Sequence, residues 1–150
     1  MNVALFLHVL GVVVWVGGMF FAYLALRPVA ASVLEPPQRL ILWRGVFGRF
    51  FPWVWISVLL ILVSGLWMFM LMGVGSAPVY VHAMFGLGIL MMLIFFRVFF
   101  APYRRLKRAV AGEDWKAAGA ALAQIRKLVG LNLSLGLITI AVAMLGRLIG

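Results

Sequence analysis

Residues 50–96 read FFPWVWISVLLILVSGLWMFMLMGVGSAPVYVHAMFGLGILMMLIFF and contain no charged side chain. A helix needs about 20 consecutive apolar residues to cross the core of a bilayer, so this stretch is long enough for two membrane spans. The segment 73–78, GVGSAP, interrupts it with residues that are typical of a tight turn. We therefore expect two antiparallel membrane helices, near residues 51–72 and 79–100.

Two further stretches, residues 1–26 and 128–146, also lack charged side chains. They predict spans near residues 3–26 and 128–148. The first has neither a basic leading region nor a cleavage site of small residues, so we interpret it as a span rather than a signal peptide. Hydrophobic residues make up 67% of the chain, and the spans lack the polar faces of a soluble bundle. The predicted fold is all-α, an integral membrane four-helix up-down bundle that forms a single domain over residues 1–150.

The basic residues lie almost entirely in two places, between the first and second spans and around the loop between the third and fourth. Arg147 is the exception on the other side. Because basic loops stay in the cytoplasm, we expect both termini outside and a multi-pass protein of the bacterial inner (plasma) membrane. The net charge of +10 then indicates contact with the lipid bilayer and not with nucleic acid.

The two basic loops predict short amphipathic helical segments. Pro36 and Pro37 precede mixed apolar and basic residues, which favours a short helix lying at the membrane interface. In the second loop, Glu113 and Asp114 are typical of a helix N-terminus. We expect the fourth helix to begin there, before it enters the membrane.

The two histidines of the chain, His8 and His82, lie near the starts of the first and third spans. These spans run in the same direction in an up-down bundle, so both imidazoles are expected at similar depth near the periplasmic face. Two facing imidazoles are what the iron of haem b needs. Gly11 and Gly86, one turn from each histidine, would admit the flat ring. This pattern predicts a haem b protein that transfers electrons, or a small oxidoreductase that uses quinone or a periplasmic redox partner.

Arg147 extends this hypothesis. A haem held at the depth of the histidines carries two propionates that the protein must accommodate. Burying these charged groups without a partner costs free energy. Arg147, near the end of the fourth span, is predicted to pair with one of them. The alternative interpretation is an arginine that anchors the helix end at the interface.

Methionines give the rival prediction. Met72 lies at the outer end of the second span, and Met84 lies two residues after His82 in the third. Thioethers together with imidazoles form a soft ligand set suited to copper. A cofactor-free structural membrane subunit is the third alternative. The chain has no cysteine, which excludes thiolate ligands, and no carboxylate within a span, which argues against a proton relay in the membrane. The sequence identifies no catalytic residue and leaves open whether the protein is an enzyme. A homo-oligomer is also left open.

Two short stretches carry a family resemblance. The first is HVLG at residues 8–11, continued by VWVGGMF at 14–20, and the second is QIRKLVGLN at 124–132. Both are similar to the CopD-type family of membrane proteins, named for copper resistance D. The resemblance covers most of the chain and implies copper uptake or tolerance.

A more distant likeness is to the HemJ-type protoporphyrinogen oxidases, which are small haem-binding membrane proteins with a histidine in the first span. Their third span carries a lysine two residues after the position of His82. Here Met84 occupies that position. This departure argues against protoporphyrinogen oxidation and leaves the predicted haem ligation by His8 and His82 unaffected.

Overall fold

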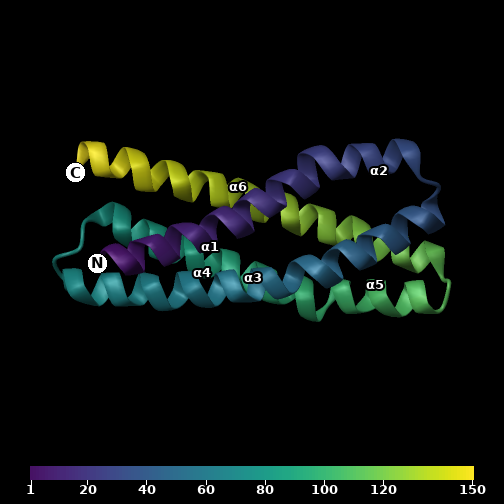
Figure 1. Ribbon diagram of the computed structural model, residues 1–150, viewed down its shortest axis with the longest axis horizontal. Coiled ribbons are helices and arrows are strands. Elements are labelled where there is room, and N and C mark those ends of the chain that lie inside the picture. The colour runs from purple at the N-terminus through teal and green to yellow at the C-terminus, as the bar shows by residue number, and fades with distance from the viewer.

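The computed structural model describes residues 1–150 as four long helical rods without a strand (Figure 1). Each rod is long and apolar enough to cross a membrane, which confirms the predicted all-α, four-span architecture. The first rod consists of α1 (Asn2–Phe20), the π-helical segment η1 (Phe21–Leu26) and α2 (Arg27–Val33). The second rod is α3 (Pro36–Met72), and the third consists of α4 (Val79–Phe100) and α5 (Pro102–Ala111). The fourth rod is α6 (Trp115–Ile149).

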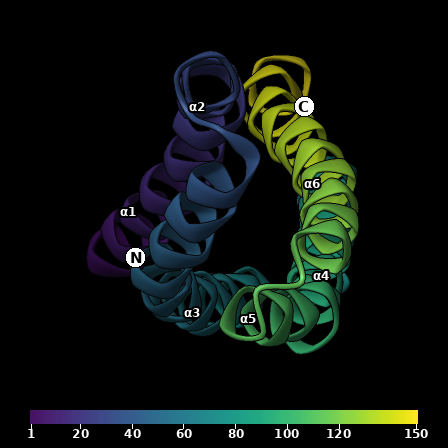
Figure 2. The same cartoon turned by 90° about the vertical axis from the view of Figure 1, so that its right-hand side faces the viewer.

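The rods form two antiparallel hairpins. In the first hairpin α1 packs mainly on α3, and in the second α4 and α5 pack on α6. Figure 2 views the molecule along its length and shows the first hairpin on one side and the second on the other. Both termini and the loop at residues 73–78 lie at one end of the molecule (Figure 1). We call this end the histidine end. The opposite end, which carries the loops at residues 34–35 and 112–114, is called the basic end.

The rods are longer than the hydrocarbon core of a bilayer. α3 has 37 residues, which at 1.5 Å per residue is about 55 Å, against a core of about 30 Å. The prediction of a separate interfacial helix beginning at Pro36 was therefore wrong, because α3 continues from Pro36 through Pro52 to Met72. The first rod likewise continues beyond the predicted limit at residue 26, to Val33.

An aromatic ladder explains why α3 remains one helix. Trp43, Phe47 and Phe51 are spaced four residues apart and therefore share a face. Their neighbouring ring centroids lie 5.3 and 5.0 Å apart, and Tyr103 of α5 meets the ring of Phe51 edge-on at 4.8 Å. All four side chains are buried. This packing holds α3 in helical register on both sides of Pro52, which itself lacks one backbone donor.

The loop that precedes α6 matches its prediction. α5 is amphipathic, because Tyr103 and Leu106 are buried while Arg104 and Arg108 are exposed. The Oδ1 atom of Asp114 accepts a hydrogen bond from the backbone N–H of Ala117 at 3.1 Å. Such a cap satisfies a donor that the first turn of a helix would leave unpaired, so α6 begins well before its apolar stretch.

Contacts near the centre join the two hairpins. The indole of Trp15 in α1 meets the ring of Phe95 in α4 edge-on, with centroids 6.2 Å apart. Within the second hairpin, the side-chain N–H of the buried Asn132 in α6 donates to the carbonyl of Met91 in α4 at 3.1 Å.

Candidate functional site

His8 and His82 lie at the same end of the molecule, as predicted. His8 is in α1 and His82 is near the start of α4, and these two helices run in the same direction (Figure 1). The up-down order of the rods produces this arrangement, because the first and third rods must then be parallel. The structure thus places both imidazoles at the histidine end.

His8 is half-buried against the neighbouring helix α3. Its Nδ1 atom lies 3.2 Å from Oγ of Ser64. Gly65 makes this approach feasible, because a Cβ atom at Gly65 would lie 3.3 Å from Cε1 of His8. The ring therefore packs closely on the backbone of α3.

The hydroxyl of Ser64 determines which nitrogen of His8 is free. Ser64 Oγ has the carbonyls of Leu60 and Ile61 in its own helix as acceptors for its single hydrogen. With the hydrogen used within the helix, the oxygen accepts from His8. The Nδ1 atom then carries the proton, and Nε2 keeps its lone pair. Histidines that bind metals usually donate their other ring N–H to a neighbouring group in this manner, so the contact is compatible with a ligand role for Nε2.

His82 is exposed and is engaged by the turn that precedes α4. Its Nδ1 atom lies 3.1 Å from the carbonyl oxygen of Pro78, and its Nε2 atom lies 3.2 Å from that of Val74. Phe69 of α3 meets its ring edge-on at 5.2 Å. Both oxygens are acceptors, so a neutral ring donates to one of them only. His82 must release one of these contacts before that nitrogen can bind a metal.

The two histidines contact the same helix and not each other. Ser64 and Phe69 are five residues apart on α3, which corresponds to about 140° around the helix axis. No backbone contact joins α1 to α4. A serine within an apolar span, such as Ser64, predicts a hydrogen bond between helices, and the contact with His8 confirms it. The sequence did not identify His8 as the partner, because no spacing within the chain indicates which helix a histidine will face.

The other residues of the haem hypothesis have different surroundings. Gly11 packs against α3, since a Cβ atom there would lie 2.9 Å from Cγ1 of Ile61. A Cβ atom added at Gly86 would meet no other atom within 4 Å. Arg147 is exposed near the end of α6. The roles of these three residues at a haem stay predictions.

Soft donors are concentrated at the histidine end. Met68, Met70 and Met72 lie in the last turns of α3, and Met84 lies in the first turns of α4. The acidic residues of the chain, Glu35, Glu113 and Asp114, all lie in or beside the loops of the basic end. The structure contains no group of three or more His, Cys, Asp or Glu side chains that would hold a metal ion. The imidazole and thioether side chains are the soft donors at this end.

Comparison with known families identifies the family of the chain. The family model of CopD, copper resistance protein D, matches residues 44–145. The matched part includes α4 with His82 and most of α3 with Ser64, while His8 lies before it. No curated protein and no solved structure matches the chain. Because the match covers more than half of its length, this multi-pass membrane protein belongs to the CopD family.

Proposed function

We propose that this protein handles copper in the inner membrane of a bacterium, binding the ion at the histidine end through His8, His82 and nearby methionines. The observation that carries the proposal is the separation of donor types along the bundle. Both imidazoles and several thioethers lie at one end, and all carboxylate side chains lie at the other. Membership of the CopD family supports the same metal.

Copper in its reduced form suits this donor set. Thioethers and imidazoles are soft or intermediate ligands that select Cu(I), whereas Mg²⁺, Ca²⁺ and Mn²⁺ prefer carboxylates. Met72 and Met84 flank the segment formed by the turn at residues 73–78 and the first residues of α4, which include His82. In this proposal, the two thioethers complete a site that the histidines begin.

The two histidines have different parts in binding. His8 is the preformed ligand, because Ser64 leaves its Nε2 atom free. His82 becomes a ligand after one of its ring nitrogens leaves the carbonyl of Val74 or Pro78. Binding at His82 is thus linked to movement of the turn at residues 73–78, and that turn connects the two hairpins.

The haem b hypothesis, with electron transfer to quinone or a periplasmic redox partner, uses the same histidines and has less support. A bis-histidine haem requires the two imidazoles to face each other across the porphyrin. Instead, both rings contact α3, and Ile61 fills the space beside Gly11. The parallel placement of α1 and α4 is the observation that favours this second candidate.

Metal analysis and absorption spectroscopy of the detergent-purified protein distinguish these functions. We expect Cu(I), titrated in competition with a chelator, to bind with defined stoichiometry and without a Soret band. His8→Ala and His82→Ala should each weaken Cu(I) binding by at least about tenfold, which corresponds to about 1.4 kcal/mol. Met72→Leu and Met84→Leu should weaken it by a smaller factor.

Met19→Leu is the matched control, because Met19 is buried in α1 away from the histidine end. This variant should bind Cu(I) like the unchanged protein. A Soret band that disappears in both histidine variants would replace copper with haem b. Unchanged copper binding in the double histidine variant would contradict the proposal, and absence of both cofactors would favour the structural subunit.

A further inference from the structure

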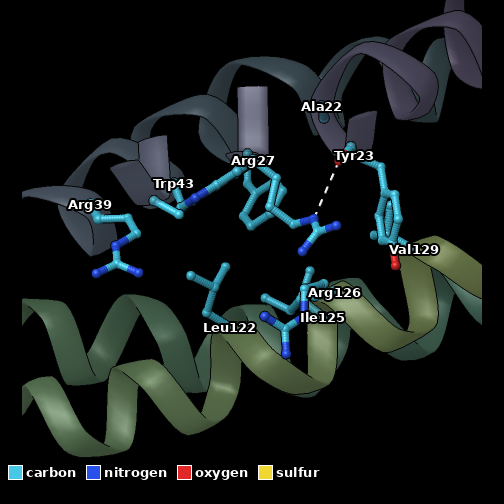
Figure 3. A pocket seen from close by; sticks show the side chains of 11 residues that line it. Ala22, Tyr23, Arg27, Arg39, Trp43, Leu122, Ile125, Arg126 and Val129 are labelled. Atoms are coloured by element: carbon cyan, nitrogen blue, oxygen red, sulfur yellow. Dashed lines mark hydrogen bonds between the residues drawn. The ribbon is translucent and has the colours of Figure 1, made fainter. Parts of the chain in front are cut away.

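A cavity at the basic end brings together arginines from three helices. It has a volume of about 110 Å³ and lies between the first rod, α3 and α6. Arg27 of α2, Arg39 of α3 and Arg126 of α6 line it. Figure 3 shows Arg27 between the two walls, with Arg126 on the α6 side and Arg39 farther along α3. These residues are widely separated in the sequence, and only the packing of the hairpins brings them to one cavity.

No carboxylate neutralises these arginines within the cavity. Neither aspartate nor glutamate is among its lining residues. The Nε atom of Arg39 is buried and has no hydrogen-bond partner. A buried donor of a charged group costs free energy when it is left unpaired. The cavity therefore has a strong preference for an anion.

Arg27 is positioned with its terminal nitrogens still free. Its Nε–H donates to the carbonyl of Tyr23 at 3.3 Å, and its guanidinium carbon lies 4.5 Å from the centroid of the Tyr23 ring. The ring packs against Gly130 of α6, where a Cβ atom would lie 3.0 Å from Cε2 of Tyr23. Tyr23 is thus held between α6 and Arg27. The fork of a guanidinium held in this way matches two oxygens of a phosphate group.

The backbone beside the cavity is also unusual. The segment η1, Phe21–Leu26, is a π-helix, and it supplies Ala22 and Tyr23 to the cavity wall. Short π-helical segments inside α-helices are found frequently at functional sites. Here the wider turn comes directly before Arg27 and so helps to set where Tyr23 and Arg27 lie.

The ligand must combine a negative charge with apolar surface. Besides the arginines, most of the lining is apolar or aromatic, including Trp43 and Phe47. Phe21 and Leu24 of η1 are exposed on the outside of the same segment, within an apolar rod. The cavity has room for a headgroup but not for acyl chains, which would lie along this outer surface. A soluble anion would gain nothing from these exposed side chains.

We propose that this cavity binds the phosphate headgroup of an anionic phospholipid from the leaflet next to the basic loops. Arg27, Arg39 and Arg126 hold the phosphate, and Tyr23 keeps Arg27 in position. The bound lipid connects the first hairpin to α6 at the end of the molecule where these elements would otherwise repel one another. The site is separate from the copper site and does not depend on it.

The test is a lipid titration of the detergent-purified protein, with the midpoint of thermal unfolding as the measurement. We expect phosphatidylglycerol to raise the midpoint and phosphatidylcholine to have little effect, because a ligand that binds only the folded state stabilises it. Arg27→Gln, Arg39→Gln and Arg126→Gln should each weaken the affinity for phosphatidylglycerol, taken from the lipid concentration that produces this response, by about tenfold, or about 1.4 kcal/mol. Native mass spectrometry of the unchanged protein should detect retained anionic lipid.

Arg108→Gln is the matched control, because Arg108 is an exposed arginine of α5 outside the cavity. It should respond to phosphatidylglycerol like the unchanged protein. An equal loss in Arg108→Gln, or equal stabilisation by both lipids, would overturn the proposal. Full stabilisation by inorganic phosphate alone would overturn the lipid source and assign the site to a soluble phosphate. Copper binding, measured in the same variants, should be unchanged, so a failure here is distinct from a failure of the copper proposal.

Discussion

The Nδ1 atom of His8 lies 3.2 Å from Oγ of Ser64, so the first rod presents its only imidazole to α3. The contact favours the tautomer of His8 that carries its proton on Nδ1, because the hydroxyl hydrogen of Ser64 is used within its own helix. The same contact gives the copper proposal its most direct test. Groups that orient a metal-binding histidine affect affinity although they do not touch the metal.

We expect Ser64→Ala to weaken Cu(I) binding by about tenfold, since loss of such an orienting group costs about 10- to 100-fold. Ser57→Ala is the matched control, because Ser57 is also buried on α3 and has no contact with His8. Chelator competition measures both. Equal affinity in the two variants would mean that Ser64 does not orient the ligand.

Adjacent glycines in α1 should respond differently to the same change. A Cβ atom at Gly18 would overlap the ring of Phe50 in α3, whereas one at Gly17 meets no atom within 4 Å. We expect Gly18→Ala to destabilise the protein by about 1–3 kcal/mol through overpacking. Gly17→Ala should have no such effect. Thermal unfolding in detergent compares the two, and equal midpoints would contradict this packing of α1 on α3.

The hydrogen bond from Asn132 to Met91 links α6 to α4. The Oδ1 atom of Asn132 is buried without a partner, so the side chain gains from one hydrogen bond only. Hydrogen bonds between membrane helices contribute about 0.6 kcal/mol on average. Asn132→Leu should therefore change stability by no more than about 1 kcal/mol, as measured by unfolding in mixed micelles. A loss several times larger would indicate that Asn132 has a further partner.

The orientation in the membrane is a prediction from charge. With the basic end in the cytoplasm, Ser76→Cys in the turn between α3 and α4 should react with an impermeant thiol reagent in intact cells. Ser32→Cys, near the end of α2, should react only after the cells are opened. The chain has no cysteine of its own, so the background is low. Labelling of Ser32→Cys from outside would reverse the orientation.

The haem-related prediction concerning Arg147 has its own test. If a propionate pairs with this residue, Arg147→Gln should loosen the cofactor and lower its midpoint potential. If copper is the ligand, both metal content and affinity should be unchanged, because Arg147 is exposed and offers no donor atom to a metal. Metal and haem analysis of this variant therefore provides a second comparison between the two cofactors.

Much of the architecture followed from local patterns along the chain. The charge-free stretches predicted four spans, the residues at 73–78 predicted a turn, and the acidic pair at 113–114 predicted the start of α6. The shared end of His8 and His82 followed from chain order alone. Each of these features depends on neighbouring residues or on the alternation of helix direction, which a single sequence displays directly.

The tertiary structure decided how the helices face one another. Phe47 and Phe51 keep α3 continuous through Pro52 by packing on Tyr103, which lies far away in the sequence. His8 faces Ser64 for the same reason, because the rotation of a helix about its axis is set by the packing of both partners. The side chains of these helices are apolar around the whole circumference, so the sequence has no polar face that would indicate the rotation. The arginine cavity is likewise a product of packing, since loop charges alone indicate only orientation in the membrane.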